Sequence, residues 1–230
     1  MSPAGILGSA TGRGVLFFVL YARTLRAAFE RRTTWAALAF ALLAGAGFES
    51  AGAPTGPYLV DRGLGLDTIG WFRGLAVVGA MLAGALAGGV LADRWGKARA
   101  SAAFLSGLVV IVAGLAAVEH RVPATGSPGS PAEAWLVLSI LALMYLGCGL
   151  FVAASYALFM ELTDARLGGT QFSLFMAATN GCESWSTWVG GQIVERGGYA
   201  ASFLALSAVS LLALPLPIWL SRHARNARRA

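Results

Sequence analysis

Long apolar stretches occupy most of this chain and decide what it can fold into. An α-helix rises 1.5 Å per residue, so about 20 apolar residues cross the roughly 30 Å of hydrocarbon in a bilayer. By this criterion we expect six membrane-spanning helices. The predicted spans lie near residues 34–53, 68–92, 100–118, 134–159, 171–193 and 199–220. The predicted fold class is therefore an all-α membrane protein.

Composition excludes the other main classes. Hydrophobic residues make up 57% of the 230 residues and charged residues only 12%, whereas soluble domains carry about 25% charged residues. We therefore expect neither a soluble domain, nor a disordered chain, nor a nucleic-acid-binding protein. Cys148 and Cys182 lie in apolar segments outside any CxxC pair, so we expect no metal site and no cofactor. No catalytic motif is present, so we do not expect an enzyme.

Two segments flank the predicted spans. Residues 1–33 include an apolar stretch, 15–22, that is too short to cross a bilayer and is followed by arginines. This pattern predicts an amphipathic helix on the membrane surface. Because the basic residues follow the apolar stretch, we do not expect a cleaved signal peptide. Residues 221–230 form a basic tail that we expect to contact anionic lipid.

The basic residues predict the orientation. Of the 17 Lys and Arg residues, 13 lie in the N-terminal segment, the loops after the second and fourth spans, and the tail. Basic residues favour the cytoplasmic side of a membrane. We therefore expect both termini in the cytoplasm and a multi-pass location in the inner (cytoplasmic) membrane.

The loop between the second and third spans carries the most specific motif. Residues 89–99 read GVLADRWGKAR, which resembles the signature loop of the major facilitator superfamily, G-x-x-x-D-[RK]-x-G-[RK]-x-[RK]. The matching positions are Gly89, Asp93, Arg94, Gly96, Lys97 and Arg99. We expect Gly89 to permit close helix contact, Gly96 to make a tight turn, and Asp93 to pair with basic groups or helix ends. The alternative is a loop that is basic only for topology.

Further segments resemble one branch of that superfamily. Residues 53–70, 162–177 and 190–203, with the step Gly169-Thr170-Gln171, are similar to the C-terminal half of AmpG-like muropeptide permeases and acetyl-CoA transporters. The resemblance implies a six-helix half of a secondary transporter, a permease that imports a muropeptide or related solute by proton symport. Transporters of this superfamily bind substrate between two such halves. We therefore expect a second six-helix half, from another copy or another chain. The alternatives are a non-transporting fragment or scaffold, and a general drug or solute efflux carrier.

Ionisable residues within the spans are candidate site residues, because charges inside a bilayer are costly and usually functional. Glu49 and Glu183 are expected past the midplane toward the outer side, with Asn180 on the same helix face as Glu183. We interpret them as lining a substrate or proton pathway; the alternative is an interhelical hydrogen bond. Arg73 is expected to extend to the outer interface or to contact substrate.

A second charged group lies at the inner end of the fourth span. Glu161, Asp164 and Arg166 are expected to form an ion-pair cluster with the loop that contains Asp93. Such a cluster would serve as a cytoplasmic gate, although loop salt bridges contribute little to stability.

Overall fold

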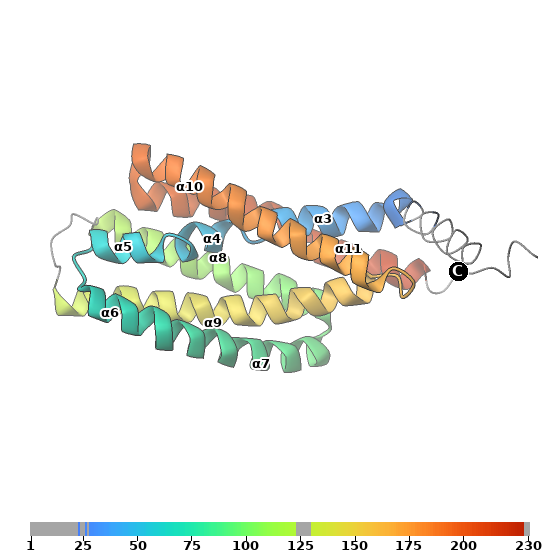
Figure 1. The fold of residues 1–230 in the computed structure, drawn as a ribbon, viewed down its shortest axis with the longest axis horizontal. Coiled ribbons are helices and arrows are strands. Elements are labelled where there is room, and N and C mark those ends of the chain that lie inside the picture. Colours follow the sequence, from blue (N-terminus) through green and yellow to red (C-terminus); the bar gives the residue numbers. More distant parts are fainter. Residues whose placement is uncertain (1–22, 24–25, 27, 123–129, 228–230) are drawn as a thin grey trace, which may run out of the picture.

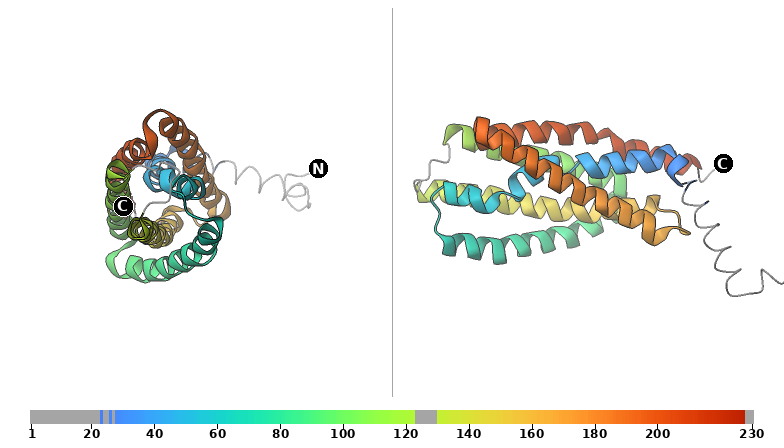
Figure 2. Two further views of the ribbon diagram at one scale, coloured as in Figure 1. Left: turned by 90° about the vertical axis from the view of Figure 1, so that its left-hand side faces the viewer. Right: turned by 45° about the horizontal axis from the view of Figure 1, so that its top comes forward.

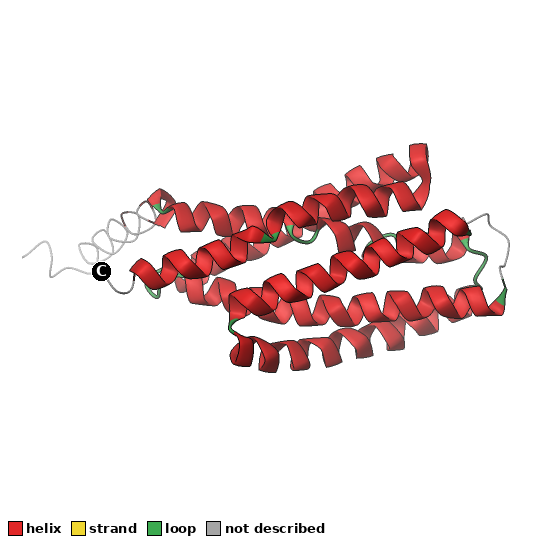
Figure 3. Ribbon diagram, turned by 180° about the vertical axis from the view of Figure 1, so that it is seen from behind, coloured by secondary structure: helices red, strands yellow, loops and turns green. Residues whose placement is uncertain are grey.

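Helices account for almost all of the described chain. The computed structural model describes residues 23, 26, 28–122 and 130–227, and no strand occurs among them. Five helical stretches in this part of the chain are long and apolar enough to cross a membrane. They run along one common axis (Figure 1) and form a single bundle when viewed end-on (Figure 2). The described loops between them are short (Figure 3). The described part of the chain is confirmed as all-helical, with several helices long and apolar enough to cross a membrane.

The first stretch, Arg32–Asp61, is divided into three helices. These are α3 (Arg32–Leu43), α4 (Ala46–Gly52) and α5 (Thr55–Asp61). The span extends about two turns beyond the predicted end near residue 53. Pro54 does not end this stretch. It is the N-cap of α5, a position at which a backbone N–H would have no partner within the helix, so the N–H that proline lacks is not missed.

The second and third stretches meet at a single residue. The second stretch consists of α6 (Leu66–Trp71), a π-helical turn η1 (Phe72–Ala76) and α7 (Val77–Trp95), and the third is α8 (Lys97–Arg121). Gly96 joins α7 to α8 with φ of 87°. Only glycine adopts this backbone conformation without strain. The predicted tight turn at Gly96 is confirmed.

The fourth and fifth stretches complete the bundle. Helix α9 (Pro131–Leu162) begins with a capping box between Ser130 and Glu133. Helix α10 (Gly168–Ala213) turns back at Gly198, where φ is 76° and ψ is 175°. The two arms of α10 pack together, since a Cβ on Gly190 would lie 3.1 Å from the Ser202 hydroxyl. The first arm, residues 168–197, exceeds the length of a crossing helix. The second arm, residues 199–213, continues into α11 (Pro215–Ala227) and reaches that length only together with it.

Helix α7 lies on the outer face of the bundle and packs along α9. Glycines make this contact close: a Cβ on Gly84 or Gly88 would meet the α9 backbone, and one on Gly149 would meet the α7 backbone. Small residues permit such approach between membrane helices. The other side of α7 is apolar and exposed, as a face toward lipid or another protein would be. Its large exposed side chains include Val78, Leu82, Leu86 and Val90.

The flanking segments are described only in part. Residues 1–22, 24, 25 and 27, which hold most of the predicted amphipathic helix, lie outside the described residues, as do residues 228–230 of the tail. Arg26 and Glu30 form an exposed ion pair at 3.1 Å, one helical turn apart. Helix α11 runs through residue 227, so the last span and the first part of the predicted tail are one continuous helix.

Candidate functional site

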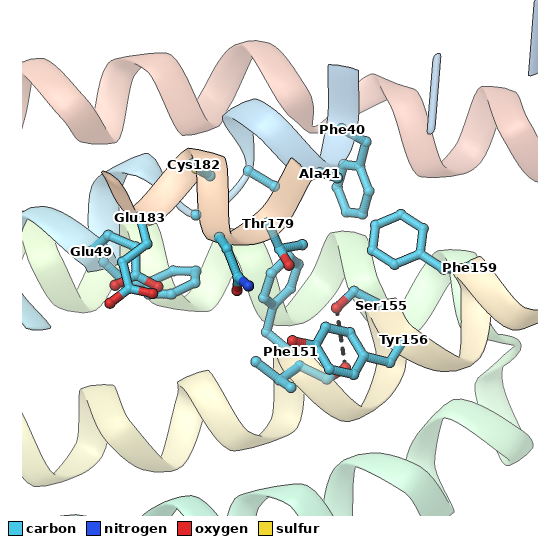
Figure 4. A pocket seen from close by; sticks show the side chains of 15 residues that line it. Phe40, Ala41, Glu49, Phe151, Ser155, Tyr156, Phe159, Thr179, Cys182 and Glu183 are labelled. Atoms are coloured by element: carbon cyan, nitrogen blue, oxygen red, sulfur yellow. Dashed lines mark hydrogen bonds between the residues drawn. The ribbon is translucent and has the colours of Figure 1, made fainter. Parts of the chain in front are cut away.

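Two glutamates meet near the middle of the bundle. Glu49 lies on α4, close to the centre of the 30-residue stretch Arg32–Asp61, and Glu183 lies near the centre of the first arm of α10. Both side chains line the same two cavities, and Figure 4 shows their carboxyl groups next to one another. Both glutamates lie near the middle of their helical stretches, and their expected position toward the outer side of the membrane stays a prediction.

A break between α3 and α4 positions Glu49. The chain loses helical pairing around Ala44 and Gly45. The Ser210 hydroxyl accepts a hydrogen bond from the Gly47 N–H and donates one to the Ala44 carbonyl, each at 2.8 Å. Backbone groups within a bilayer must find such partners. The small residues here also let α4 lie against the second arm of α10, with a Gly47 Cβ position only 2.9 Å from the Ser207 Cα.

The wider cavity, of about 420 Å³, contains the charged side chains. Arg73 reaches it from the π-helical turn η1, a local geometry that is frequent at functional sites. A Cβ on Gly56 would lie 2.8 Å from Arg73 Nη1, so the guanidinium lies across α5. Arg73 is exposed as well as lining the cavity, and its expected extension to the outer interface stays a prediction. The lining is Phe48, Glu49, Gly52, Ala53, Arg73, Met81, Tyr145, Cys148, Val152 and Glu183.

Tyr145 is the main neutral polar group of the wider cavity. Its hydroxyl lies 2.9 Å from the Gly52 carbonyl and 2.8 Å from the Thr55 hydroxyl, at hydrogen-bonding distance from both. These contacts hold α9 against the junction of α4 and α5. The tyrosine ring therefore has a defined position beside Glu49.

An adjoining recess of about 100 Å³ runs from the two glutamates between aromatic side chains. Five aromatic residues line it: Phe40, Phe48, Phe151, Tyr156 and Phe159. Phe40 and Phe48 each contact Phe151 edge-to-face, with ring centroids 6.0 and 5.7 Å apart. Thr179 and Asn180 add polar groups on the α10 side. The predicted grouping of Asn180 with Glu183 and Glu49 is therefore seen in the structure.

The charged side chains of the site have no pairing partner. Among the described residues, no hydrogen bond or ion pair involves the side chain of Glu49, Glu183 or Arg73. The two carboxylates repel each other electrostatically. Glu183 and Asn180 are also exposed on the side of the bundle. Because lipid cannot solvate a charge at this depth, this side must face water or another protein.

The loop with the signature motif lies at the end of the bundle where α7 meets α8. A Cβ on Gly89 would have no atom within 4 Å, so the helix contact expected there is absent from the described structure. Asp93, Arg94 and Arg99 are exposed and form no ion pair with other described residues. The expected pairing of Asp93 is therefore also absent. Lys97 does pair, at 3.7 Å, with Glu161 at the end of α9.

The predicted inner-end cluster is divided between two sites. Glu161 pairs with Lys97, whereas Asp164 pairs with Arg31 at 3.5 Å. The backbone N–H of Arg166 donates to the Asp164 carboxylate, and no ion pair involves the Arg166 side chain in the described structure. The expected single cluster with the Asp93 loop is wrong, because the segment after α9 turns toward the start of α3.

Gln171 strengthens this second contact. Its side chain accepts a hydrogen bond from the Asp164 N–H at 2.9 Å and donates one to the Thr34 hydroxyl at 3.4 Å. Gln171 is buried. The Gly-Thr-Gln step thus joins the start of α10 to the start of α3.

A buried ion pair at the opposite end of the bundle was not predicted from the sequence. Arg62, after α5, pairs with Glu119 near the end of α8, with side-chain exposures of only 7% and 5%. Arg62 also donates to the Tyr58 hydroxyl at 2.9 Å and to the Val122 carbonyl at 2.6 Å. Burial opposes the charge on Arg62 and is the largest single influence, but the hydrogen bonds and electrostatic attraction of Glu119 and Tyr58 together outweigh it, so the pKa of the guanidinium is raised. No local motif links two residues that are 57 positions apart.

Beside this pair, the Tyr199 hydroxyl donates to Asp61 at 2.7 Å. The contact brings the second arm of α10 to the same end of the bundle as α5 and α8. Three membrane-spanning stretches are therefore joined there by polar side chains.

No group of three or more His, Cys, Asp and Glu side chains that could hold a metal ion occurs in the part of the chain that the structure describes. In comparisons with known proteins, no family model matches the sequence and no curated protein matches it. Functional inference therefore depends on the geometry of the cavity and on the sequence motifs.

Proposed function

We propose that this chain is a secondary transporter, or one half of one, that moves an organic solute across the cytoplasmic membrane by alternating access coupled to protons. The observation that carries the proposal is the mid-bundle cavity, where Glu49, Glu183 and Arg73 lie without pairing partners. Ionisable groups at this depth are typical of substrate and proton pathways. An apolar cavity with a few polar groups is the usual form of a small-molecule site.

The exposed side of the cavity supports a second half. Glu183 and Asn180 face outward from the bundle at mid-span, so a covering unit would enclose them together with water and solute. In this proposal the chain is a six-helix half of the major facilitator type with both termini in the cytoplasm. The second half is another copy or a separate chain. The muropeptide that the AmpG-like resemblance implies is the first solute to test.

Uptake into proteoliposomes tests the proposal. Purified chain is reconstituted and uptake of a labelled muropeptide and of small organic solutes is measured with and without a pH gradient. We expect Glu183→Gln to abolish gradient-driven uptake, because it removes an ionisable group from the cavity. Glu195→Gln is the matched control, since it removes an exposed carboxylate that lines neither cavity.

Two results would contradict transport. Gradient-driven uptake that is unchanged in Glu183→Gln would exclude the proton role of that residue. The non-transporting fragment would be favoured if the purified protein had the mass of one 23.7 kDa chain and took up no solute. A particle of about twice that mass that transports would support pairing of two copies.

A further inference from the structure

We propose that the solute held in this cavity is an organic monocation with one aromatic or branched alkyl group, such as an arylalkylammonium ion. The inference names the substrate class of the proposed transporter and rests on that function. It depends on two features of the same site, which are the charge balance of the wider cavity and the aromatic wall of the recess.

The charge balance favours a single positive charge. Of the described side chains that line the two cavities, Glu49, Glu183 and Arg73 are those of acidic and basic residues. With both carboxylates ionised, the cavity carries one net negative charge. One cation compensates it, whereas an anion would increase the repulsion that the two carboxylates already exert on each other.

The aromatic recess favours an organic cation over a hydrated metal ion. Phe48 and Phe151 border both the recess and the region of the glutamates, so a ligand held by the carboxylates extends between aromatic rings. Aromatic faces attract ammonium groups, and apolar walls bind hydrocarbon. The recess volume of about 100 Å³ is comparable to the cavities, about 150 Å³, that hold one benzene ring. A ligand with one ring and one cationic group matches both parts.

The same features disfavour an acidic solute. A muropeptide carries peptide carboxylates, which would lie against Glu49 or Glu183 with only Arg73 to compensate. Aromatic residues make up five of the lining positions of the recess, which favours a ligand with a ring or an alkyl group at that end. The cavity is therefore better suited to the general efflux type of carrier than to a muropeptide permease.

A binding titration separates these possibilities. The full chain in lipid nanodiscs is titrated with benzyltrimethylammonium and with phenylacetate, an anion of similar size, by saturation-transfer NMR, with empty nanodiscs as background. We expect the cation to bind at least about tenfold more tightly than the anion, since contacts with charged groups are the stronger ones. The double variant Glu49→Gln/Glu183→Gln is expected to weaken cation binding by at least about tenfold, and Glu195→Gln to leave it unchanged.

Equal binding of the two ligands, binding of neither, or full cation affinity in the double variant would each overturn the inference. The comparison on the unmodified chain needs no variant, so misfolding of the double variant does not weaken it. Uptake is measured on the same preparations. Cation binding without uptake of any solute would refute transport and retain the cation site. Uptake of a muropeptide without cation binding would retain transport and refute the cation site.

Discussion

Replacing Gly88 by alanine tests the contact between α7 and α9. A Cβ at this position would lie 2.7 Å from the Leu150 Cα and 2.6 Å from the Leu150 carbonyl oxygen. Carbon atoms in favourable contact are about 3.5–4.0 Å apart, so the helices would have to separate by about 1 Å. The contacted atoms belong to the backbone of α9, so no flexible side chain can move away.

The expected penalty is that of an overpacked core, about 1–3 kcal/mol in the free energy of unfolding. A glycine-to-alanine change also favours the helix by up to about 1 kcal/mol. Gly89→Ala is the matched control, because it brings the same gain in helix propensity while its Cβ has no atom within 4 Å. The difference between the two variants therefore isolates the packing term.

Unfolding of both variants is followed by circular dichroism during titration of mixed micelles with sodium dodecyl sulphate. We expect Gly88→Ala to unfold at the lower denaturant fraction, with a free energy about 1–3 kcal/mol below that of Gly89→Ala. Unfolding curves that coincide within about 0.5 kcal/mol would show that α7 does not pack on α9 through Gly88.

Three further results are expected from the same assay. Glu119→Leu should destabilise the fold by about 3–5 kcal/mol, because it leaves the Arg62 charge buried without a partner. The double variant Arg62→Met/Glu119→Leu should recover most of that loss, and an equally unstable double variant would contradict the ion pair. Gly198→Ala should lower the free energy of unfolding by about 1–2 kcal/mol relative to Gly191→Ala, since of these two glycines Gly198 alone has a positive φ. Equal stability of the two variants would contradict the turn at Gly198. Lys97→Gln should change stability by less than about 1 kcal/mol, as its ion pair is partly exposed, and a larger loss would mean that this contact supports the fold.

The fold was largely predictable because its cause is local. Hydrophobic length alone located the spans, and the glycine within the motif located the turn at residue 96. The errors arose at prolines and glycines, whose effect depends on the neighbouring helices. Gly88 and Gly89 are adjacent and identical in sequence terms, yet only Gly88 contacts α9. Which side of α7 faces the bundle is a tertiary property, so no pattern within one helix determines it.

The candidate site was predictable only in part. Charge within an apolar stretch singled out Glu49 and Glu183 without any knowledge of the fold. The aromatic recess was not predicted, because its rings come from α3, α4 and α9, and phenylalanine is common in any membrane span. The Arg62–Glu119 pair was missed for the same reason, since the two residues belong to different spans and meet only when α5 and α8 are packed.

The two ends of the bundle differ in how firmly they are held, and this difference bears on a transport cycle. At one end, the ion pair of Arg62 with Glu119 is nearly inaccessible to solvent, so separating its partners would leave a buried charge uncompensated. At the other end, the pairs of Lys97 with Glu161 and of Arg31 with Asp164 are partly exposed, and such pairs contribute about 0–1 kcal/mol each. Local opening of the helices is therefore easier at the end that carries the signature loop. Since the aromatic recess runs from the glutamates toward Phe40 and Phe159 (Figure 4), a solute released on that side would leave through the less firmly held end of the bundle.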